Sequence, residues 1–549
     1  MNNDQLIAQH VKDKKISVDF KERRLNQWNE NYFLYRDKIA TNRLSMRQPV
    51  NIPIMRETIQ TWISKIDEPP FLTFEARTKG NKAEDGQIII NQLWDYYYDK
   101  LKLDLVDNLQ KKVVGLQGRV FKKWGWANGE IFCDVIDPYD IEIDPRCSPL
   151  DISTASFVIH KNIFKPLREI LSNEKYDNEA KNTLKVWLDS KEGIIKANEI
   201  RDEWFMRQER LRALGAYNFD DMEATDLLVE INESYRMVWS NKDKRFVRHL
   251  IVIAADKAVL YNKPLKEAIG IERLPIVSWA DDPDLNDIWC DGKGDNVRTI
   301  NKIVNIYFSQ DLENRAHRNY GMYFYNTLNG TFSPRAFEPK PFGMYGVPGN
   351  PDEIMKQMRI EPLSDTSNQI SFLKDLVQSS VAQTATERGI ESTSGTTLGE
   401  VKLNLQQSTG RNEVTAKNYR KDWEESGEIF YMLLEANSNG VITLYKKSAE
   451  GNYESKDIFP SDWVNPKGYE CKVVMKSQKD NENNFIIQKL SYIDSSFVNN
   501  PVALKLSRKK KLEVLGWTPE EIEQVMQYEE QASQPQQPIQ PEQPLTPQQ

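Results

Sequence analysis

The sequence predicts an α+β fold that is mainly helical, and three observations indicate this class. Apolar side chains recur at three- and four-residue steps in the long segments 83–114, 291–326 and 398–436, as they do along one face of a helix. Segments 116–160 and 227–277 instead contain short strand-like runs separated by turns, which predicts antiparallel strands. Only 39% of the residues are hydrophobic and the mean hydropathy is −0.64, so much of the surface is expected to be wet or covered by polar subunit contacts.

Composition limits the function classes. At 549 residues the chain could hold roughly three or four domains. Its formal net charge of −8 excludes a generally basic nucleic-acid binder. An acidic chain could still contact DNA that has to slide past it without being bound tightly. Four cysteines are scattered without a CxxC motif, which argues against a zinc site or a disulfide framework and suits a reducing cytoplasm. No apolar run approaches the roughly 18 residues of a membrane span, and no signal-peptide pattern is seen at the N-terminus.

Two Asp-Pro turns punctuate the stretch 136–148. Proline fixes its own φ and pushes the preceding Asp toward extended geometry, so the pairs at 137–138 and 144–145 bracket a short strand-like run. Residues 116–126, just upstream, are typical of a strand, and Gly115 is expected to end the preceding helix with a left-handed cap. The predicted order is therefore long helix, glycine, strand, tight turn, strand, Asp-Pro, strand and Asp-Pro.

The remaining N-terminal half is predicted to be helical first and mixed later. Residues 1–65 should form helices, with aromatic side chains on one face between Phe20 and Tyr35. The part from 157 to 277 should combine helix and antiparallel sheet, with a helix starting at Leu167. Its strand-like runs begin at Phe157, Leu227, Phe246 and Leu274.

A helix with one apolar face is predicted over 291–326, and Asp291 or Asp295 can cap its start. Prolines and glycines then interrupt residues 327–364. A second helix should begin at Thr366, where Gln369 completes a capping box.

The polar segment 387–397 is predicted to be a flexible loop, and a capping box of Thr397 and Glu400 opens a long helix after it. Strand-like runs after residue 437 lead into helices at 482–495 and 501–515, and Thr518 starts one more. From residue 532 the chain is Gln and Pro with almost nothing apolar, which predicts disorder.

This order of elements resembles the portal proteins of tailed bacteriophages, in particular podovirus-like portals. The resemblance spans residues 20 to about 530 and rests on the stretch 136–148 and on the helix, interruption, helix, loop and long helix that follow residue 290. Asn42-Arg43 and the Pro-x-x-Arg segment 51–56 fill places that portals use near their N-terminus. Gly395-Thr396-Thr397-Leu398 lies where portals often carry a Gly/Thr-rich start to the long helix, with Leu398 in place of the usual alanine.

The resemblance implies a portal fold with wing, stem, clip and crown regions, assembled into a closed ring. The implied regions are a wing at 1–290, a first stem helix at 291–326, a clip at 327–364, a second stem helix at 365–386, a tunnel loop at 387–397, a long backbone helix at 398–436, C-terminal wing strands at 437–480, crown helices at 481–531 and a disordered Gln/Pro tail at 532–549.

The resemblance also implies a mechanical function. A ring usually of about twelve copies, made through heterologous contacts, would lie at one capsid vertex and pass double-stranded DNA without sequence specificity. Its implied partners are the large subunit of the terminase motor, the head-tail adaptor, the major capsid protein and the scaffolding protein. No catalysis, cofactor or membrane is expected, and the protein would be assembled in the host cytoplasm and reside in the virion.

Three groups of candidate site residues follow from this resemblance, each with a plainer alternative. The tunnel loop would contact passing DNA, or would only connect two helices. The clip cations would dock a partner or a neighbouring subunit, or would touch DNA phosphates. The crown cations would contact packaged DNA, or would form a solvated helix face. The residues are Arg388, Ser392, Thr393, Ser394 and Thr396 in the loop, Arg335, Lys340, Lys356 and Arg359 in the clip, and Lys505, Arg508, Lys509, Lys510 and Lys511 in the crown.

Other function classes remain as alternatives. No nucleotide-binding, hydrolase or metalloprotease motif is found. The acidic set 281–287 is the best metal candidate, but it lacks the glycine and terminal Glu of an EF-hand, which favours a solvated loop. The acidic residues at 134–144 favour turns over a metal site, and the four histidines are expected to be ordinary surface or core residues. The rival functions are another virion structural protein, such as a minor head or scaffold protein, and a metal-dependent DNA-processing enzyme.

Overall fold

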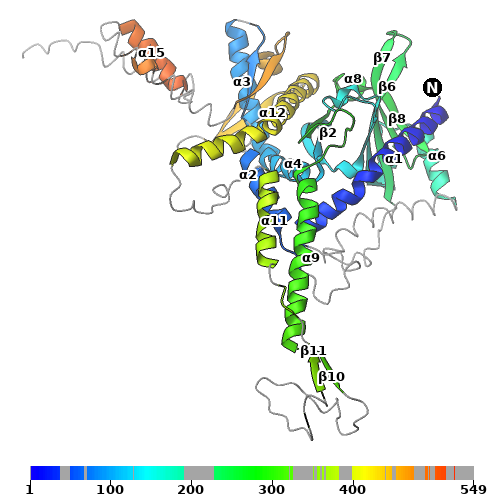
Figure 1. The fold of residues 1–549 in the computed structure, drawn as a ribbon. Helices are drawn as coiled ribbons and strands as arrows, with labels where there is room; N and C mark the ends of the chain where they lie inside the picture. Colours follow the sequence, from blue (N-terminus) through cyan, green and yellow to red (C-terminus); the bar gives the residue numbers. More distant parts are fainter. Residues whose placement is uncertain are drawn as a thin grey trace, which may run out of the picture. The chain divides into compact units, whose positions relative to one another are not determined.

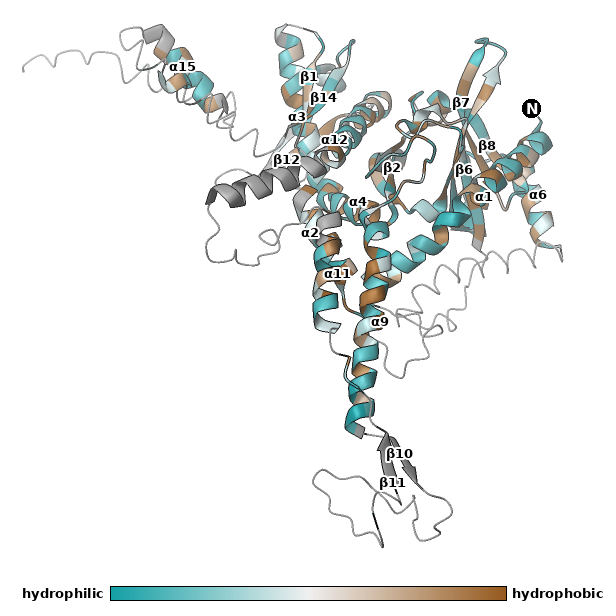
Figure 2. Cartoon of the chain, in the orientation of Figure 1, coloured by the Kyte–Doolittle hydropathy of each residue, from teal (hydrophilic) through white to brown (hydrophobic). Residues whose placement is uncertain are grey.

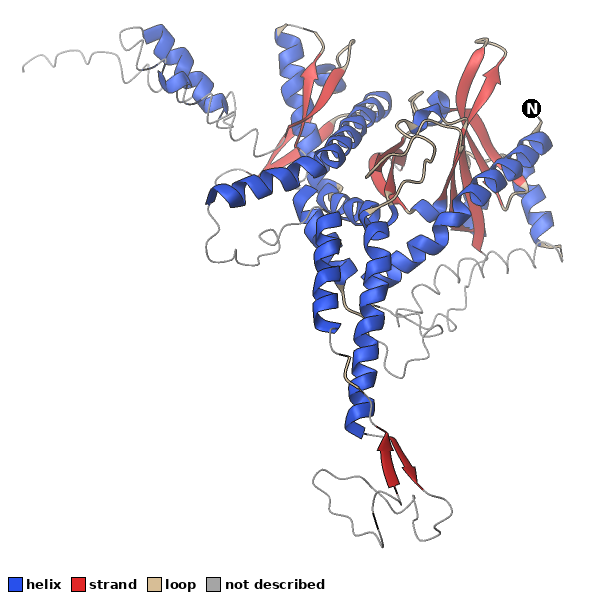
Figure 3. Ribbon diagram, viewed as in Figure 1, coloured by secondary structure: helices blue, strands red, loops and turns tan. Residues whose placement is uncertain are grey.

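The computed structural model divides the chain into two compact units, Met1–Lys472 and Val473–Gln549, each considered by itself here. The residues it describes are 2–37, 50–66, 71–78, 80–127, 129–190, 228–320, 322–325, 350, 355–358, 361–363, 366–381, 398–438, 440–447, 453–474, 487, 489–492, 494, 501–514 and 525. Helices and sheets are both abundant, which confirms the predicted α+β class (Figure 3).

In the described residues before Gly118, the chain forms four helices and one strand: α1 (Asn3–Tyr35), α2 (Ile54–Ile66), β1 (Phe71–Ala76), α3 (Asn81–Lys100) and α4 (Leu103–Gln117). Asn2 and Gln5 form a reciprocal capping box at the start of α1. The single helix predicted over 83–114 is wrong, because Lys102 takes a left-handed conformation with φ of 52° and separates α3 from α4.

The predicted cap at Gly115 is also wrong. Gly115 lies inside α4, where a Cβ atom would come within 3.0 Å of the Trp62 ring, so its role is close packing. The helix ends two residues after Gly115, and Gly118 takes the positive φ of 83° at the cap. Its N–H donates to the Val114 carbonyl at 2.8 Å.

A five-stranded antiparallel sheet forms the larger β region, in the order β4-β5-β6-β7-β8. Figure 1 labels three of its strands, β6, β7 and β8. Its strands are β4 (Ile141–Ile143), β5 (Phe157–Pro166), β6 (Leu228–Ser240), β7 (Arg245–Ala254) and β8 (Ala258–Pro264). Alternate residues of β7 face opposite sides: Ile251 and Ile253 pack with Leu6 of α1, while Val252 and Ala254 pack in another cluster. That second cluster includes α5 (Leu167–Ser172) and α6 (Asn178–Leu188).

A three-stranded antiparallel sheet joins β3 (Glu130–Ile136), β2 (Arg119–Ala127) and β9 (Ile276–Ala280), with α8 (Leu265–Ile269) before β9. Its core contains Trp28 of α1, which meets Trp289 edge-on at a centroid distance of 5.4 Å. Both Asp-Pro turns are confirmed, because the Tyr139 and Arg146 N–H groups donate to the Asp137 and Asp144 carboxylates at 3.1 Å.

Helix α9 (Lys293–Tyr320) and helix α11 (Thr366–Ser380) pack side by side, and a two-stranded hairpin continues from α9. Its strands are β10 (Met322–Tyr325) and β11 (Met355–Met358), with Met322 opposite Met358. The expected helix to residue 326 is therefore too long, since α9 ends at Tyr320 and a strand follows. Figure 2 shows that α9 carries hydrophilic and hydrophobic residues along its length.

The long helix α12 (Leu398–Asn437) confirms the expected element at 398–436. After it come β12 (Ile442–Lys447), β13 (Tyr453–Ile458), α13 (Pro460–Trp463) and β14 (Tyr469–Val474), and the second unit contains α15 (Pro501–Val514). Strand β14 pairs with β1, which the sequence analysis did not predict. The expected disordered tail at 532–549 and most of the expected helix at 482–495 lie outside the described residues.

Candidate functional site at the root of helix α9

Helix α9 begins at a crowded junction that glycines make possible. A Cβ atom on Gly292 would lie 2.7 Å from the Gly118 nitrogen and 2.8 Å from the Val114 carbonyl oxygen, so only glycine fits against the end of α4. The Gly292 N–H donates to the Asp295 carboxylate at 3.0 Å. Asp295 therefore caps the helix from its first turn, as one of the two predicted caps.

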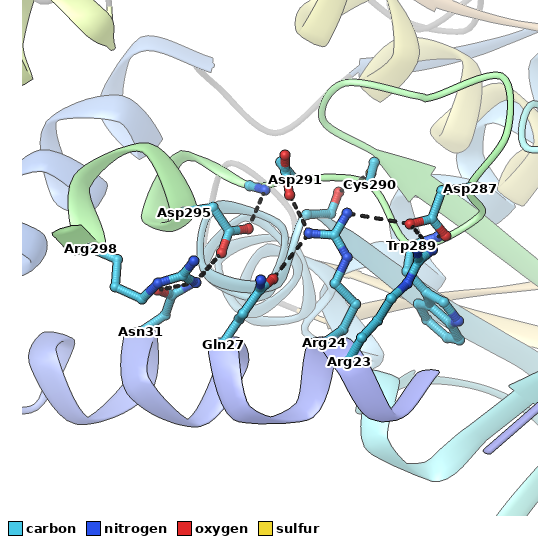
Figure 4. Close-up of polar contacts among 12 residues, drawn as sticks. Arg23, Arg24, Gln27, Asn31, Asp287, Trp289, Cys290, Asp291, Asp295 and Arg298 are labelled. Atoms are coloured by element: carbon cyan, nitrogen blue, oxygen red, sulfur yellow. Dashed lines mark hydrogen bonds and ion pairs between the residues drawn. The ribbon is translucent and has the colours of Figure 1, made fainter. Parts of the chain in front are cut away.

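Helix α1 lines this junction with polar side chains, which Figure 4 shows. Asn31 donates to the Leu116 carbonyl at 2.8 Å and to the Asp295 carboxylate at 3.0 Å. Arg298, one turn into α9, donates to the same carboxylate at 2.6 Å. Asp295 thus joins the start of α9 to α1 through charge-assisted hydrogen bonds.

The loop that precedes α9 is held by two arginines of α1. Arg23 bonds the Asp287 carboxylate at 2.6 Å, and Arg24 bonds both Asp287 and Asp291 (Figure 4). Burial lowers the pKa of Arg24, but Asp291 and Asp287 outweigh this effect and the pKa is raised. Arg24 therefore stays charged in this position.

Asp281 ties the same loop to α9 and α12. Its side chain is 2% exposed, 3.1 Å from the Lys293 ammonium, and accepts a hydrogen bond from the Thr415 hydroxyl at 2.8 Å. Burial raises the pKa of Asp281, and Lys293 and Thr415 oppose the rise. The expected solvated loop is therefore wrong for Asp281 and Asp287, which are buried and paired, although Asp282 and Asp284 are exposed as expected.

A ladder of three polar side chains on α9 binds the backbone of residues 50–55. The Met55 N–H donates to Asn301 at 2.9 Å, the Ile52 N–H to Asn305 at 2.9 Å, and the Val50 N–H to Ser309 at 3.1 Å. Asn301 also donates to the Ile52 carbonyl at 3.1 Å. The ladder residues, Asn301, Asn305 and Ser309, are spaced by four and therefore lie on one face of α9.

Replacing Asn301 with alanine should lower the free energy of unfolding by about 2–4 kcal/mol. Asn301 is fully buried, so the Met55 N–H and the Ile52 carbonyl would each lose a partner that water cannot replace. The urea midpoint, followed by tryptophan fluorescence, measures the loss. Asn296→Ala, an exposed site on the same helix, is the matched control, and an equal effect of the two variants would contradict this account.

A second buried network fixes the middle of α12. The Asp107 carboxylate of α4 accepts from the Tyr419 hydroxyl at 2.7 Å and from the Trp423 ring nitrogen at 3.2 Å. Lys122 of β2 pairs with Asp422 at 2.5 Å and lies 3.6 Å from the centre of the Trp423 ring. Burial raises the pKa of Asp422, while Lys122 opposes the rise. This network holds α12 against the three-stranded sheet.

These contacts fix the positions of helices and of the loop before α9. Asp281, Asp287, Asp291 and Asp295 each contact a lysine or an arginine. Within the described ranges, no group of three or more His, Cys, Asp or Glu side chains has the arrangement of a metal site. Among the predicted turn acids, Glu142 is fully buried between Lys21 and Lys161 at 2.7 Å from each, so it belongs to a buried ion pair.

The candidate site residues from the sequence are placed only in part. The whole loop 387–397, with Arg388, Ser392, Thr393, Ser394 and Thr396, lies outside the described residues, as do Arg335, Lys340 and Arg359 of the clip. Lys356 lies in β11 opposite Phe324. In the crown patch, Lys505, Arg508, Lys509 and Lys510 are exposed on α15, and Lys511 is 2.5 Å from Asp494.

No protein-family model matches the chain, and no curated protein matches it either. None of the helices in the described part of the chain combines the length and the apolar character needed to cross a bilayer.

The sequence analysis missed the α9 ladder and the α1 arginines. Asn301 and Asn305 carried the signal, since two asparagines four residues apart inside a predicted helix are unfavourable unless they have partners. Arg23 and Arg24 gave no such signal, because the sequence of a charged helix does not show which charges find partners.

Proposed function

We propose that the chain is a bacteriophage portal protein, one subunit of a ring that passes double-stranded DNA through a capsid vertex. The observation that carries the proposal is the order α9, β10, β11, α11 and α12: two packed helices joined through a β-hairpin, then a helix of 40 residues. This order resembles the portal layout of stem helix, clip, stem helix and backbone helix. In a portal ring, the two sheets formed by β2 to β9 would belong to the wing.

The root of α9 supports this proposal on mechanical grounds. A stem that holds DNA and docks a motor must pass load to the rest of the subunit without shearing. Asp295, Asp281 and the α9 ladder connect α9 to α1, α12 and residues 50–55 through directional hydrogen bonds. Such bonds fix a register that a purely apolar contact would leave less well defined.

The test of this function is the assembly state of the purified full-length chain. Negative-stain electron microscopy should show closed rings with an axial hole wide enough for a DNA duplex, and light scattering should give about twelve times the subunit mass of 63.9 kDa. If the rings are absent, addition of the scaffolding protein from the same source should restore them. A protein that stays monomeric under both conditions, or a monomer that cleaves DNA with Mg²⁺, would overturn the proposal.

Weak DNA contact by the second unit is a further expected result. Lys505, Arg508, Lys509 and Lys510 cluster on α15, and phosphate contacts by lysine are independent of sequence. The double variant Lys509→Glu/Lys510→Glu should lower the salt dependence of DNA binding, the slope of log K against log salt, by about 2. Lys12→Glu/Lys15→Glu on α1 is the charge-matched control. If both variants have the same slope, the crown cations form a solvated face.

A further inference from the structure

The loop between β9 and α9 presents one apolar side chain on a rigid base. Asp281 and Asp287 at its two ends are buried and paired, to Lys293 at 3.1 Å and to Arg23 at 2.6 Å. Between them, Leu285 is 86% exposed, the largest value among the exposed large apolar side chains of the described residues. Both ends of the loop are thus fixed by buried pairs, which reduces the entropy lost on binding.

Carboxylates flank this leucine. Asp282 and Asp284 are both exposed, and the Asp284 carboxylate accepts the Asn286 N–H at 3.0 Å, which closes a local turn. Residues 282–286, called here the acidic loop, therefore present a leucine between negative charges. A complementary surface would need an apolar hollow with a positive rim.

A pocket of about 280 Å³ beside β7 and α8 has this character. Its apolar wall is formed by Met237, Phe246 and Leu274. Its volume lies just below the roughly 300–1,000 Å³ of small-molecule sites, so a side chain fits it better than a cofactor does. Phe246 also meets Trp239 edge-on at 5.2 Å, and both rings are exposed, which extends the apolar wall outside the pocket.

Four cations line the pocket against the one carboxylate of Glu272. One of them, Arg273, is also paired with Glu425 and Glu428 of α12. Arg245 and Lys266 lie 3.6 and 3.4 Å from the same carboxylate, that of Glu272, so two cations share one anion. Arg248 forms part of the wall and donates to the carbonyls of Ser153 at 2.7 Å and Ala155 at 3.1 Å. These carbonyls are neutral. Burial lowers the pKa of Arg248, and among the carboxylates of the described residues only Asp151 is close enough to oppose this effect. The lining therefore favours an anionic occupant.

We propose that this pocket receives Leu285 and its flanking carboxylates from the acidic loop of a second copy of the chain. The apolar wall matches Leu285, and Arg245 and Lys266 at the rim match Asp282 and Asp284 in charge. Loop and pocket are different surfaces of the same unit, so the contact is heterologous, the kind that closes rings. The inference rests on the proposed function, because it names two of the faces through which neighbouring subunits of the ring meet.

Cross-linking between two single-cysteine variants tests the contact. The four native cysteines are buried, and burial raises the pKa of the thiols, to about 12 for Cys133 and about 11 for Cys147, so they react slowly. Leu285→Cys places a thiol on the acidic loop, and Met237→Cys places one in the pocket wall. After mild oxidation, a mixture of these two variants should give a disulfide-linked dimer, at least tenfold above a mixture in which Leu150→Cys replaces Leu285→Cys. Neither variant alone should form it.

A charge exchange provides a second, independent test. Asp284→Lys added to the Leu285→Cys chain should lower the dimer yield at least fivefold, and Lys266→Glu added to the Met237→Cys chain should restore it. No dimer above the Leu150→Cys control, or a dimer from Leu285→Cys alone, overturns the inference. Rings without the cross-link leave the portal proposal standing and remove this contact. The cross-link without closed rings retains the contact and counts against the portal proposal.

Discussion

Replacing Gly118 with alanine is expected to lower the free energy of unfolding by about 3–5 kcal/mol. Gly118 has φ of 83°, which a side chain disfavours, and its Cβ would lie 2.1 Å from the carbonyl oxygen of Cys290. The clash is with backbone, so no rotamer can relieve it. The Gly118 carbonyl also accepts the Asp281 N–H at 2.9 Å, so the shift would disturb the loop before α9. Urea unfolding of both chains measures the difference.

The variant Gly129→Ala measures the backbone strain without the steric clash that Gly118→Ala would add. It has the same φ of 83°, but a Cβ there would meet nothing within 4 Å. Gly129→Ala should therefore cost only the conformational strain, about 1 kcal/mol or slightly more. If Gly118→Ala costs no more than Gly129→Ala, the junction between α4 and the loop is looser than these contacts indicate.

The second large effect is expected at Glu142. This carboxylate is fully buried, 2.7 Å from both Lys21 and Lys161, and it accepts the Ser17 hydroxyl at 2.8 Å. Glu142→Ala would leave the buried Lys21 ammonium without its carboxylate, at a cost of about 3–5 kcal/mol. Burial already lowers the pKa of Lys21 to about 8, against the attraction of Glu142. Thermal and urea unfolding should both register the loss.

Two control variants test whether the unpaired buried charge causes the loss of stability in Glu142→Ala. The double variant Lys21→Met/Glu142→Leu removes both buried charges and should recover much of the lost stability. Glu75→Ala breaks an exposed pair with Lys472 and should change stability by less than about 1 kcal/mol. Because Met and Leu keep the side-chain volumes, a double variant as unstable as Glu142→Ala would contradict the role given to the unpaired Lys21 charge.

The pH dependence of the free energy of unfolding should also show the contribution of Glu142. Burial alone would raise the pKa of Glu142, but Lys21 and Lys161 outweigh burial and hold the pKa below its usual 4.5. A lowered folded-state pKa gives stability that is present above the unfolded value and is lost as the pH falls through the folded value. The fall in stability from about pH 6 to about pH 3 should therefore be smaller in Glu142→Ala than in the wild type.

Local sequence patterns predicted most of the helices and strands, but not all of the residues at which they begin and end. The strand at β2 and the helix α12 follow from apolar spacing, which acts over a few residues. The break between α3 and α4 at Lys102 could not be predicted, because a lysine carries no sign that it will take a left-handed conformation. Gly115 and Gly118 are three residues apart, and only the position of Trp62 explains why the first glycine packs and the second caps.

Long-range contacts account for what the sequence did not predict at the site. Strand β1 pairs with β14 from the far end of the first unit, so no local alternation could reveal their pairing. Asp281 was predicted as a solvated loop residue because the acidic set 281–287 lacks the glycine and terminal Glu of an EF-hand. Its burial depends on Lys293 and Thr415, and Thr415 comes from a helix more than a hundred residues later.

The spacing of the α9 ladder limits how this helix can move. A shift of α9 by four residues, about 6 Å along its axis with a rotation of about 40°, would bring Asn301 to the place of Asn305 and Asn305 to that of Ser309. Two of the three bonds to residues 50–55 could then form again, whereas a half-turn displacement would satisfy none. Any sliding of α9 along this segment would therefore have to proceed in steps of four residues, with a barrier of broken hydrogen bonds between them.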